Sequence, residues 1–528
     1  MVSGCCERPG RAGTARQPLS RYVNVLTITL TTYYTDYVSR LPKPSELHDR
    51  SEEWAALAEF ASDPDPGTVL GIVYGRRRQG KTLLLELLAE AMDGLTFTGL
   101  QQANSQNLAD LAAAYAGFAG VPSASFGNWA DAVEALVTIG ERVGRPVPVV
   151  LDEFPYLVDQ APELPSVLQR VLSPRSRARL SGQVKLILCG SAFTVMRGLL
   201  AGSAPLRGRA KLELLVQPFD FRDAADFWNV LDEPELAFRL HALVGGTPAY
   251  RAMCIDRPRG AAEFDDWVIQ RLLNPASAMF REGSALLYEE PELGDAALYH
   301  AVLGAICGGS HKRSDIAKRL GRQDSALTHP LEMLERVQLI SKVNDALRSR
   351  RPLYQTTEPL IRLQHLVIRP FEARLVGRGR AHVWEQAQDM VESLIFGPHL
   401  EDLARSWCAD HAAPETLGGL PSRCEPALIA CREHKKSHEL DVVVSADPPQ
   451  QASRILAIGE VKATTWQVGL NQLERLRHIR SLLPAGLMVG PPRLLLFSRQ
   501  GFTPDLIAEA HTSTEVELID LPRLYHGS

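Results

Sequence analysis

One short segment constrains the fold of this chain more than any other feature, and it consists of Gly75, Arg76, Arg77, Arg78, Gln79, Gly80, Lys81 and Thr82. Its spacing, G-x-x-x-x-G-K-[ST], is typical of a phosphate-binding loop. The apolar run 68–74 before it predicts a buried strand, and leucines at helical spacing over 82–92 predict a helix after it. Further short apolar runs alternate with helical segments, which predicts an α/β fold with a parallel sheet.

The residue types of this segment suit a nucleoside triphosphate. Glycines let backbone N–H groups close around phosphates at a helix N-terminus. We expect the Lys81 ammonium to lie between the β and γ phosphates and the Thr82 hydroxyl to coordinate Mg²⁺. The sequence therefore predicts that ATP and Mg²⁺ are the cofactors.

A second apolar run, 147–151, ends in two acids, Asp152 and Glu153. Acids at strand ends are common, so the run indicates a site only in combination with the phosphate-binding loop. In that combination we expect Asp152 in the Mg²⁺ shell and Glu153 polarising the attacking water.

Five short motifs in order along the chain resemble the archaeal-type ATPase family, which is of the AAA+ kind and close to the STAND NTPases. They are the segments 74–82, 151–157, 188–192, 205–209 and 245–248. The resemblance covers about residues 45–275. It implies that Ser191 is a polar sensor and that the segment from Gly246 to Pro248 lines the pocket for the base.

The same resemblance places Arg209 near a nucleotide. One interpretation is a catalytic finger supplied to a neighbouring subunit, which requires a homo-oligomer. The alternative is an ordinary surface ion pair.

Residues 291–375 resemble a winged helix, with a helix and turn at 314–321, a second helix at 325–339 and a wing strand around Tyr354. Pro330 must kink the second helix or lie in its first turn. Such modules in ATPases are as often packing elements, so DNA is one alternative partner. The basic residues that would meet its phosphates are Lys312, Arg313, Lys318, Arg319 and Arg322.

The C-terminal block carries a second set of charged residues. Asp441 lies at the start of a predicted strand, and Glu460 and Lys462 lie on the next. Strand alternation puts Glu460 and Lys462 on one face. Two neighbouring carboxylates, Asp441 and Glu460, would hold a divalent metal, and a lysine beside them would stabilise a phosphorane or orient water.

This arrangement resembles the PD-(D/E)XK nuclease fold, which is familiar as the C-terminal domain of unknown function that accompanies this ATPase family. The resemblance implies that Glu401 is a helix-borne catalytic acid. Two functions stay open. Either ATP drives a metal-dependent DNA-cleaving module, or a STAND-like nucleotide switch carries a non-cutting nuclease fold that binds DNA or a protein partner.

Prolines, glycines and changes in the apolar pattern divide the chain into five predicted parts. They are a poorly ordered extension (1–44), an ATPase core (45–235), a helical lid (236–290), a winged helix (291–375) and a nuclease-like domain (376–528). Residues 22–38 alternate as an edge strand would, although an extension upstream of the first domain is equally compatible with them.

Charge, cysteine pattern and hydrophobicity limit the kinds of protein that this chain can be. A net charge of −5 indicates no overall basic field, although local basic runs remain. None of the eight cysteines forms a C-x-x-C pair, and no apolar stretch is long enough to span a membrane. We therefore expect a reduced, cytoplasmic protein without structural zinc.

Overall fold

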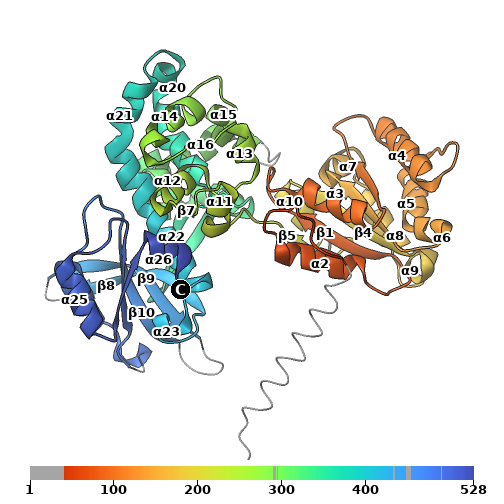
Figure 1. Cartoon of the computed structure of the whole chain (residues 1–528). Helices are drawn as coiled ribbons and strands as arrows, with labels where there is room; N and C mark the ends of the chain where they lie inside the picture. Colours follow the sequence, from red (N-terminus) through yellow and green to blue (C-terminus); the bar gives the residue numbers. More distant parts are fainter. Residues whose placement is uncertain (1–40, 289–292, 294, 432–433, 448–452, 489) are drawn as a thin grey trace, which may run out of the picture.

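The structure, a computed structural model, describes residues 41–288, 293, 295–431, 434–447, 453–488 and 490–528. The chain forms two lobes in Figure 1: an α/β lobe in red to yellow, and a lobe in green to blue that combines helices with a second sheet. The possible edge strand at 22–38 lies outside the described residues.

The first lobe is built on a parallel sheet, as the sequence predicts. Its strand order is β2-β3-β4-β1-β5, and every neighbouring pair is parallel. The strands are β1 (Val69–Tyr74), β2 (Leu95–Thr98), β3 (Val147–Asp152), β4 (Val184–Gly190) and β5 (Ala210–Leu215).

Both faces of this sheet are buried because β1, β3 and β4 are apolar on both sides. Ile72 packs into one core with Leu136, while its neighbour Val73 packs into the other with Leu57 and Leu88. The helices of the lobe are α2 (Ser51–Ala61), α3 (Lys81–Ala91), α4 (Asn104–Ala119), α5 (Trp129–Val137), α6 (Ile139–Val143), α7 (Phe154–Gln160), α8 (Leu164–Val171), α9 (Arg177–Ser181) and α10 (Phe193–Gly198).

The second lobe begins with helices that share one hydrophobic core with the C-terminal sheet. Phe238, Leu363, Trp407 and Phe497 all belong to this core, although they come from segments far apart in the chain. The helices are α11 (Phe221–Phe227), α12 (Pro234–Val244), α13 (Ala249–Met253), α14 (Phe264–Trp267), α15 (Met279–Tyr288), α19 (Pro359–Leu363), α20 (Arg369–Val376), α21 (Arg380–Val391), α22 (Gly397–Asp410) and α23 (Pro414–Leu417).

Between these helices lie α16 (Ala296–Cys307), α17 (Arg313–Leu320), α18 (Thr328–Arg336) and the antiparallel hairpin of β6 (Ile340–Asp345) and β7 (Arg348–Thr356). The predicted helix at 325–339 is shorter than expected, because a 3₁₀ turn precedes α18. Pro330 lies in the first turn of α18, where a missing N–H costs little.

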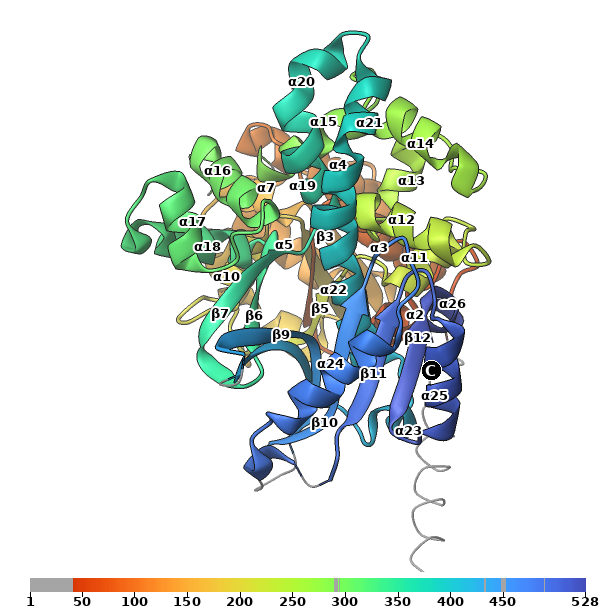
Figure 2. The same cartoon turned by 90° about the vertical axis from the view of Figure 1, so that its left-hand side faces the viewer.

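The hairpin reaches the edge of the C-terminal sheet (Figure 2). The Ala346 N–H donates to the Pro426 carbonyl at 2.9 Å, and the Leu428 N–H donates to Asp345 Oδ2 at 3.2 Å. This edge strand, β8, is thus covered by β6 and the turn that follows it.

The C-terminal sheet has the order β12-β11-β10-β9-β8. It is mixed, because β8, β9 and β10 are antiparallel whereas β10, β11 and β12 are parallel. Helices α24 (Leu470–Ser481) and α25 (Pro504–Thr512) cover one face, and α22 and α26 (Leu521–His526) lie on the other. The strands are β8 (Arg423–Cys431), β9 (Lys436–Ala446), β10 (Arg454–Lys462), β11 (Arg493–Ser498) and β12 (Val516–Asp520).

Within the described residues, no helix combines the length and the apolar character that crossing a membrane requires.

Candidate functional site

The phosphate-binding loop connects the end of β1 to the start of α3. Gly75 has φ 158° and Gly80, the residue before α3, has φ 86°. A side chain at Gly75 would place its Cβ only 2.3 Å from the Val216 carbonyl oxygen. Both glycines therefore permit a backbone path that closes around a ligand at the N-terminus of α3.

The Lys81 side chain lies inside this loop and bonds to its backbone. Its buried ammonium donates to the carbonyl oxygens of Gly75 and Arg76, both at 2.7 Å. Burial lowers the pKa of Lys81, and the neighbouring acids Glu153 and Asp152 counteract that effect. The loop thus holds a cation at its centre, where an anionic ligand would replace the carbonyl oxygens as its partner.

The carboxyl end of β3 brings the predicted acids to the same place. The Thr82 hydroxyl donates to Asp152 Oδ2 at 2.8 Å, and the Glu153 N–H donates to Asp152 Oδ1 at 2.9 Å. A hydroxyl and a carboxylate this close are the oxygen ligands that suit Mg²⁺. The structure therefore brings together Lys81, Thr82, Asp152 and Glu153.

Glu153 lies in an environment that favours its neutral form. Burial, followed by the charge of Asp152, raises the pKa of Glu153. The Ser191 hydroxyl donates to Glu153 Oε2 at 3.3 Å, and the same hydroxyl accepts from Arg77 Nε at 3.3 Å. Arg77 also donates to the Tyr156 hydroxyl. Ser191, at the end of β4, thus connects the loop to the acid on β3.

A cavity of about 360 Å³ opens beside these groups, and its walls are Arg77, Arg78, Gly80, Lys81, Thr82, Glu153, Pro248 and Ala249. Pro248 therefore lies beside the phosphate-binding loop. Gly246 does not line the cavity. It packs against Phe219, whose N–H donates to the Gly246 carbonyl at 2.9 Å and whose carbonyl oxygen would lie 1.9 Å from a Cβ.

Arg209 is not brought to this cavity. It precedes β5, and it lines a separate cavity with Thr68 and Val69 at the start of β1. Because parallel strands start at one edge and end at the other, Arg209 lies at the opposite edge from the phosphate-binding loop of its own chain.

Two side chains and one backbone carbonyl of the loop contact parts of the molecule that the sequence did not connect with them. Arg76 pairs with Glu358, and Arg78 Nη1 lies 2.7 Å from Glu282 Oε1. The Gln79 carbonyl accepts from Arg50 Nη2 at 3.2 Å.

The C-terminal acids also converge. Lys462 Nζ lies 2.6 Å from Glu460 Oε1, as expected for residues on one face of β10. Arg475 of α24 pairs with the other oxygen of Glu460. Asp441 lies in the middle of β9, and its Oδ2 accepts from the Val461 N–H at 2.8 Å.

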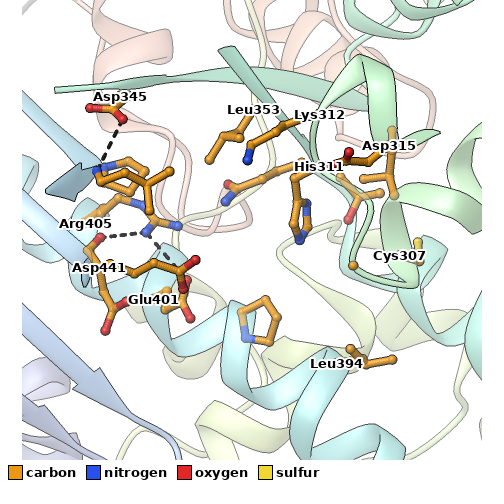
Figure 3. A pocket seen from close by; sticks show the side chains of 18 of the residues that line it. Cys307, His311, Lys312, Asp315, Asp345, Leu353, Leu394, Glu401, Arg405 and Asp441 are labelled. Atoms are coloured by element: carbon orange, nitrogen blue, oxygen red, sulfur yellow. Dashed lines mark hydrogen bonds and ion pairs between the residues drawn. The ribbon is translucent and has the colours of Figure 1, made fainter. Parts of the chain in front are cut away.

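Glu401 of α22 lies beside Asp441 in a cavity of about 330 Å³. Figure 3 shows Glu401, Arg405 and Asp441 on one side of this cavity, with His311 and Lys312 on the other. Burial and the charge of Asp441 raise the pKa of Glu401 to about 7. Burial and the charge of Glu460 raise the pKa of Asp441 to about 6. This excess of negative charge is a setting in which a divalent cation binds favourably.

Comparison with known proteins gives a match over the part of the chain that contains the first site. Residues 47–250 match the family described as an ATPase domain predominantly from Archaea. An uncharacterised protein of Methanocaldococcus jannaschii is 24% identical over 327 residues, which are 59% of this chain and 66% of that protein. The chain thus spans just under two thirds of the length of this curated relative.

Two solved structures are also similar. The Walker-type ATPase of Pyrococcus abyssi is 18% identical with a TM-score of 0.45, over 61% of this chain and 96% of that one. The ORC2 protein of Aeropyrum pernix, in its ADPNP–ADP complexes, is 17% identical with a TM-score of 0.38, over 66% of this chain and 97% of that one.

The segment that matches the family contains the whole phosphate-binding loop, both acids of β3 and Pro248. Residues 47–250 therefore form an ATPase domain.

Proposed function

We propose that the protein is a Mg²⁺-dependent ATPase whose nucleotide state controls a DNA-binding or DNA-cleaving C-terminal part. The observation that carries this proposal is the pair between Arg76 of the phosphate-binding loop and Glu358, whose side chain is only 2% exposed. Glu358 lies between β7 and α19, in the second lobe. Arg78 makes a parallel connection to Glu282 of α15, which is 3% exposed.

These pairs give the nucleotide a way to act on the second lobe. Triphosphate oxygens compete with carboxylates for guanidinium groups, since both accept the same forked hydrogen bonds. A nucleotide that attracts Arg76 or Arg78 therefore changes the free energy of a buried pair that connects the lobes. Any effect of ATP on the second lobe must be matched by an equal effect of that lobe on ATP affinity.

Within the ATPase site each residue has a distinct task. Thr82 and Asp152 would hold Mg²⁺, which neutralises charge on the phosphates when bound. The Lys81 ammonium would exchange its two carbonyl partners for phosphate oxygens. Glu153, in its charged form, would orient the attacking water and accept its proton.

The helices α17 and α18 with the β6–β7 hairpin support the winged-helix interpretation. All five basic residues expected to meet DNA are exposed, and Lys312 lines the cavity that contains Glu401. Arg313 is held by Asp324 at 2.6 Å, and Arg319 donates to the Gly308 carbonyl at 2.7 Å. We propose that Lys318 and Arg322 make the phosphate contacts.

The acid site supports a nuclease-like C-terminal part. Glu401, Asp441, Glu460 and Lys462 come from a helix and two neighbouring strands, as the PD-(D/E)XK resemblance requires. In this proposal Asp441 and Glu460 would hold a divalent metal ion with Glu401 beside them, and Lys462 would stabilise charge on the phosphodiester.

A second candidate function has its own observation. Lys462 and Arg475 already engage both oxygens of Glu460, so a metal ion would have to displace one of these cations. A C-terminal part that binds DNA or a protein partner without cutting, under the control of a STAND-like nucleotide switch, fits this arrangement equally well.

Cleavage of labelled single- and double-stranded DNA with Mg²⁺ or Mn²⁺, with and without ATP, separates the two candidates. The wild type is compared with Lys462→Ala, Lys81→Ala and the control Arg423→Ala, whose exposed partner is Asp447. The nuclease proposal expects cleavage that Lys462→Ala abolishes and Arg423→Ala retains. If no DNA is cut while ATP is still hydrolysed, the nuclease proposal is wrong and the nucleotide-switch proposal replaces it.

A further inference from the structure

A cluster outside both sites combines one thiol with three imidazoles. Cys431 ends β8, His434 lies between β8 and β9, His438 is on β9, and His478 is on α24. One ligand atom from each residue lies within 4.8 Å of each of the others. Cys431 and His438 are buried, whereas His434 is exposed.

Two distances from the thiol are close to the edge length of a metal-centred tetrahedron. Zinc bonds of about 2.3 Å to sulfur and about 2.0–2.1 Å to nitrogen, at tetrahedral angles, separate the two atoms by about 3.5 Å. Cys431 Sγ lies 3.2 Å from His434 Nδ1 and 3.6 Å from His478 Nε2. The planes of the three rings cross at 73° to 88°, so the imidazoles converge on the thiol and do not stack on one another.

His438 provides an independent indication. Its Nε2 atom is buried, and among the described residues it has no hydrogen-bond partner. A buried imidazole nitrogen without a partner loses the hydrogen bond that water would supply, which is unfavourable. A metal ion bound to this lone pair would remove that cost.

We propose that Cys431, His434, His438 and His478 bind one Zn²⁺ ion. Thiolate and imidazole are the ligands that zinc prefers, and four protein ligands fill its tetrahedral shell. With no position left for water or substrate, the ion has a structural role. The expectation of a protein without structural zinc considered cysteine pairs only, whereas three of these four ligands are histidines.

The ion would fix α24 to the β8–β9 connection, close to the acid site. Arg475 lies one helical turn before His478. It pairs with Glu460, and its Nη2 donates to the Glu439 carbonyl at 3.1 Å. Zinc at His438 and His478 would therefore hold in place the helix that carries the partner of Glu460.

The test begins with full-length protein stripped by a chelator and kept in excess Mg²⁺ to saturate oxygen-ligand sites. Zn²⁺ is titrated with metal content measured by mass spectrometry, and Co²⁺ is titrated as a spectroscopic probe. We expect one Zn²⁺ per chain, a thiolate-to-cobalt charge-transfer band, tetrahedral ligand-field bands, and a thermal midpoint that rises with Zn²⁺.

Matched variants assign the ligands. Cys431→Ser should lose the charge-transfer band and bind Zn²⁺ at least about 100-fold more weakly. Losing a residue that only hydrogen-bonds to a metal ligand already lowers metal affinity by about 10–100-fold, and losing a ligand itself should cost more. Cys424→Ser, on the same strand, should change neither. His434→Gln alters an exposed position, so it tests the site even if Cys431→Ser folds poorly.

Two results would overturn the proposal. One is a wild-type protein that binds no Zn²⁺ under these conditions. The other is a charge-transfer band that persists in Cys431→Ser or an affinity for Zn²⁺ that His434→Gln leaves unchanged.

Discussion

The two sheets of this protein assemble their charged residues in different ways. In the first sheet, the loop after β1, the acids after β3 and Ser191 after β4 all follow the carboxyl ends of parallel strands. In the C-terminal sheet, Asp441 lies in the middle of β9, Glu460 lies near the end of an antiparallel neighbour, and Glu401 comes from a helix.

This difference decides how directly a sequence specifies a site. Strand ends in a parallel sheet meet at one edge, so residues that follow successive apolar runs must converge. In a mixed sheet, the register decides which side chains lie side by side, and a shift of one residue moves each side chain to the other face. The first site is therefore a property of short motifs, whereas the second depends on the whole domain.

The largest expected effect tests the first site. Lys81→Ala should lower kcat/KM for ATP hydrolysis by about 10³-fold, because the variant removes the cation at the centre of the loop. Lys211→Ala is the control, since Lys211 is 40% exposed and pairs only with surface acids of the same lobe. Steady-state hydrolysis measures both variants. Equal activities would mean that Lys81 does not contact the nucleotide.

The connection between the two lobes should show in stability. Glu358→Gln removes the carboxylate that faces Arg76 in a buried pair, which should lower the free energy of unfolding by about 3 kcal/mol. Glu335→Gln alters an exposed pair with Lys342 and should cost at most about 1 kcal/mol. Chemical denaturation compares the two. A loss in Glu358→Gln no greater than in the control would remove the energetic basis of the connection.

Glu153 gives the first site a pH dependence. Glu153→Gln should lower kcat by about 10²-fold with ATP binding retained, and Glu163→Gln, at an exposed position, should change neither. The carboxylate must be charged to accept a proton, so activity falls as the pH falls through its raised pKa. The acid limb of kcat should therefore lie above pH 4.5, the ordinary pKa of a glutamate. An identical limb in Glu153→Gln would assign it to another group.

The acid site of the second sheet should respond to pH through stability. The pKa of Glu401 rises from 4.5 to about 7 on folding, so the folded protein binds this proton more tightly. The free energy of unfolding should therefore fall as pH rises through that range. With its side chain 36% exposed, solvent screening limits the contribution to about 1 kcal/mol.

Glu401→Gln should remove that part of the fall, and Glu415→Gln, at an exposed position on α23, should leave it intact. Denaturation at both ends of the range measures the difference. Added Mg²⁺ should restore stability at the upper end in the wild type and in Glu415→Gln. A fall that persists in Glu401→Gln would assign the proton to another acid.

The sequence predicted the first sheet and its site better than it predicted contacts between distant parts of the chain. The strands β1 and β3 appear within about a residue of their apolar runs, and Thr82 contacts Asp152, two residues that the motifs assigned to one site. The pair of Arg76 with Glu358 could not be foreseen, because it spans 282 residues and depends on how the lobes pack.

Other features were missed for related reasons. The location of Arg209 depends on which edge of the sheet β5 starts from, and spacing alone does not encode that direction. Cys431, His434 and His438 of the histidine cluster lie close together in the sequence, but their meeting with His478 depends on the packing of α24. Burial of Glu401 beside Asp441 likewise follows from tertiary packing.

The hairpin contact with β8 has a consequence for solubility. An uncovered edge strand offers unpaired N–H and carbonyl groups on which another chain can add a strand, which is a common route to aggregation. Here the Ala346 N–H donates to a carbonyl of β8, and the Asp345 carboxylate accepts from an N–H of β8. A C-terminal fragment that begins after the hairpin would expose β8, and it should self-associate where the intact chain does not.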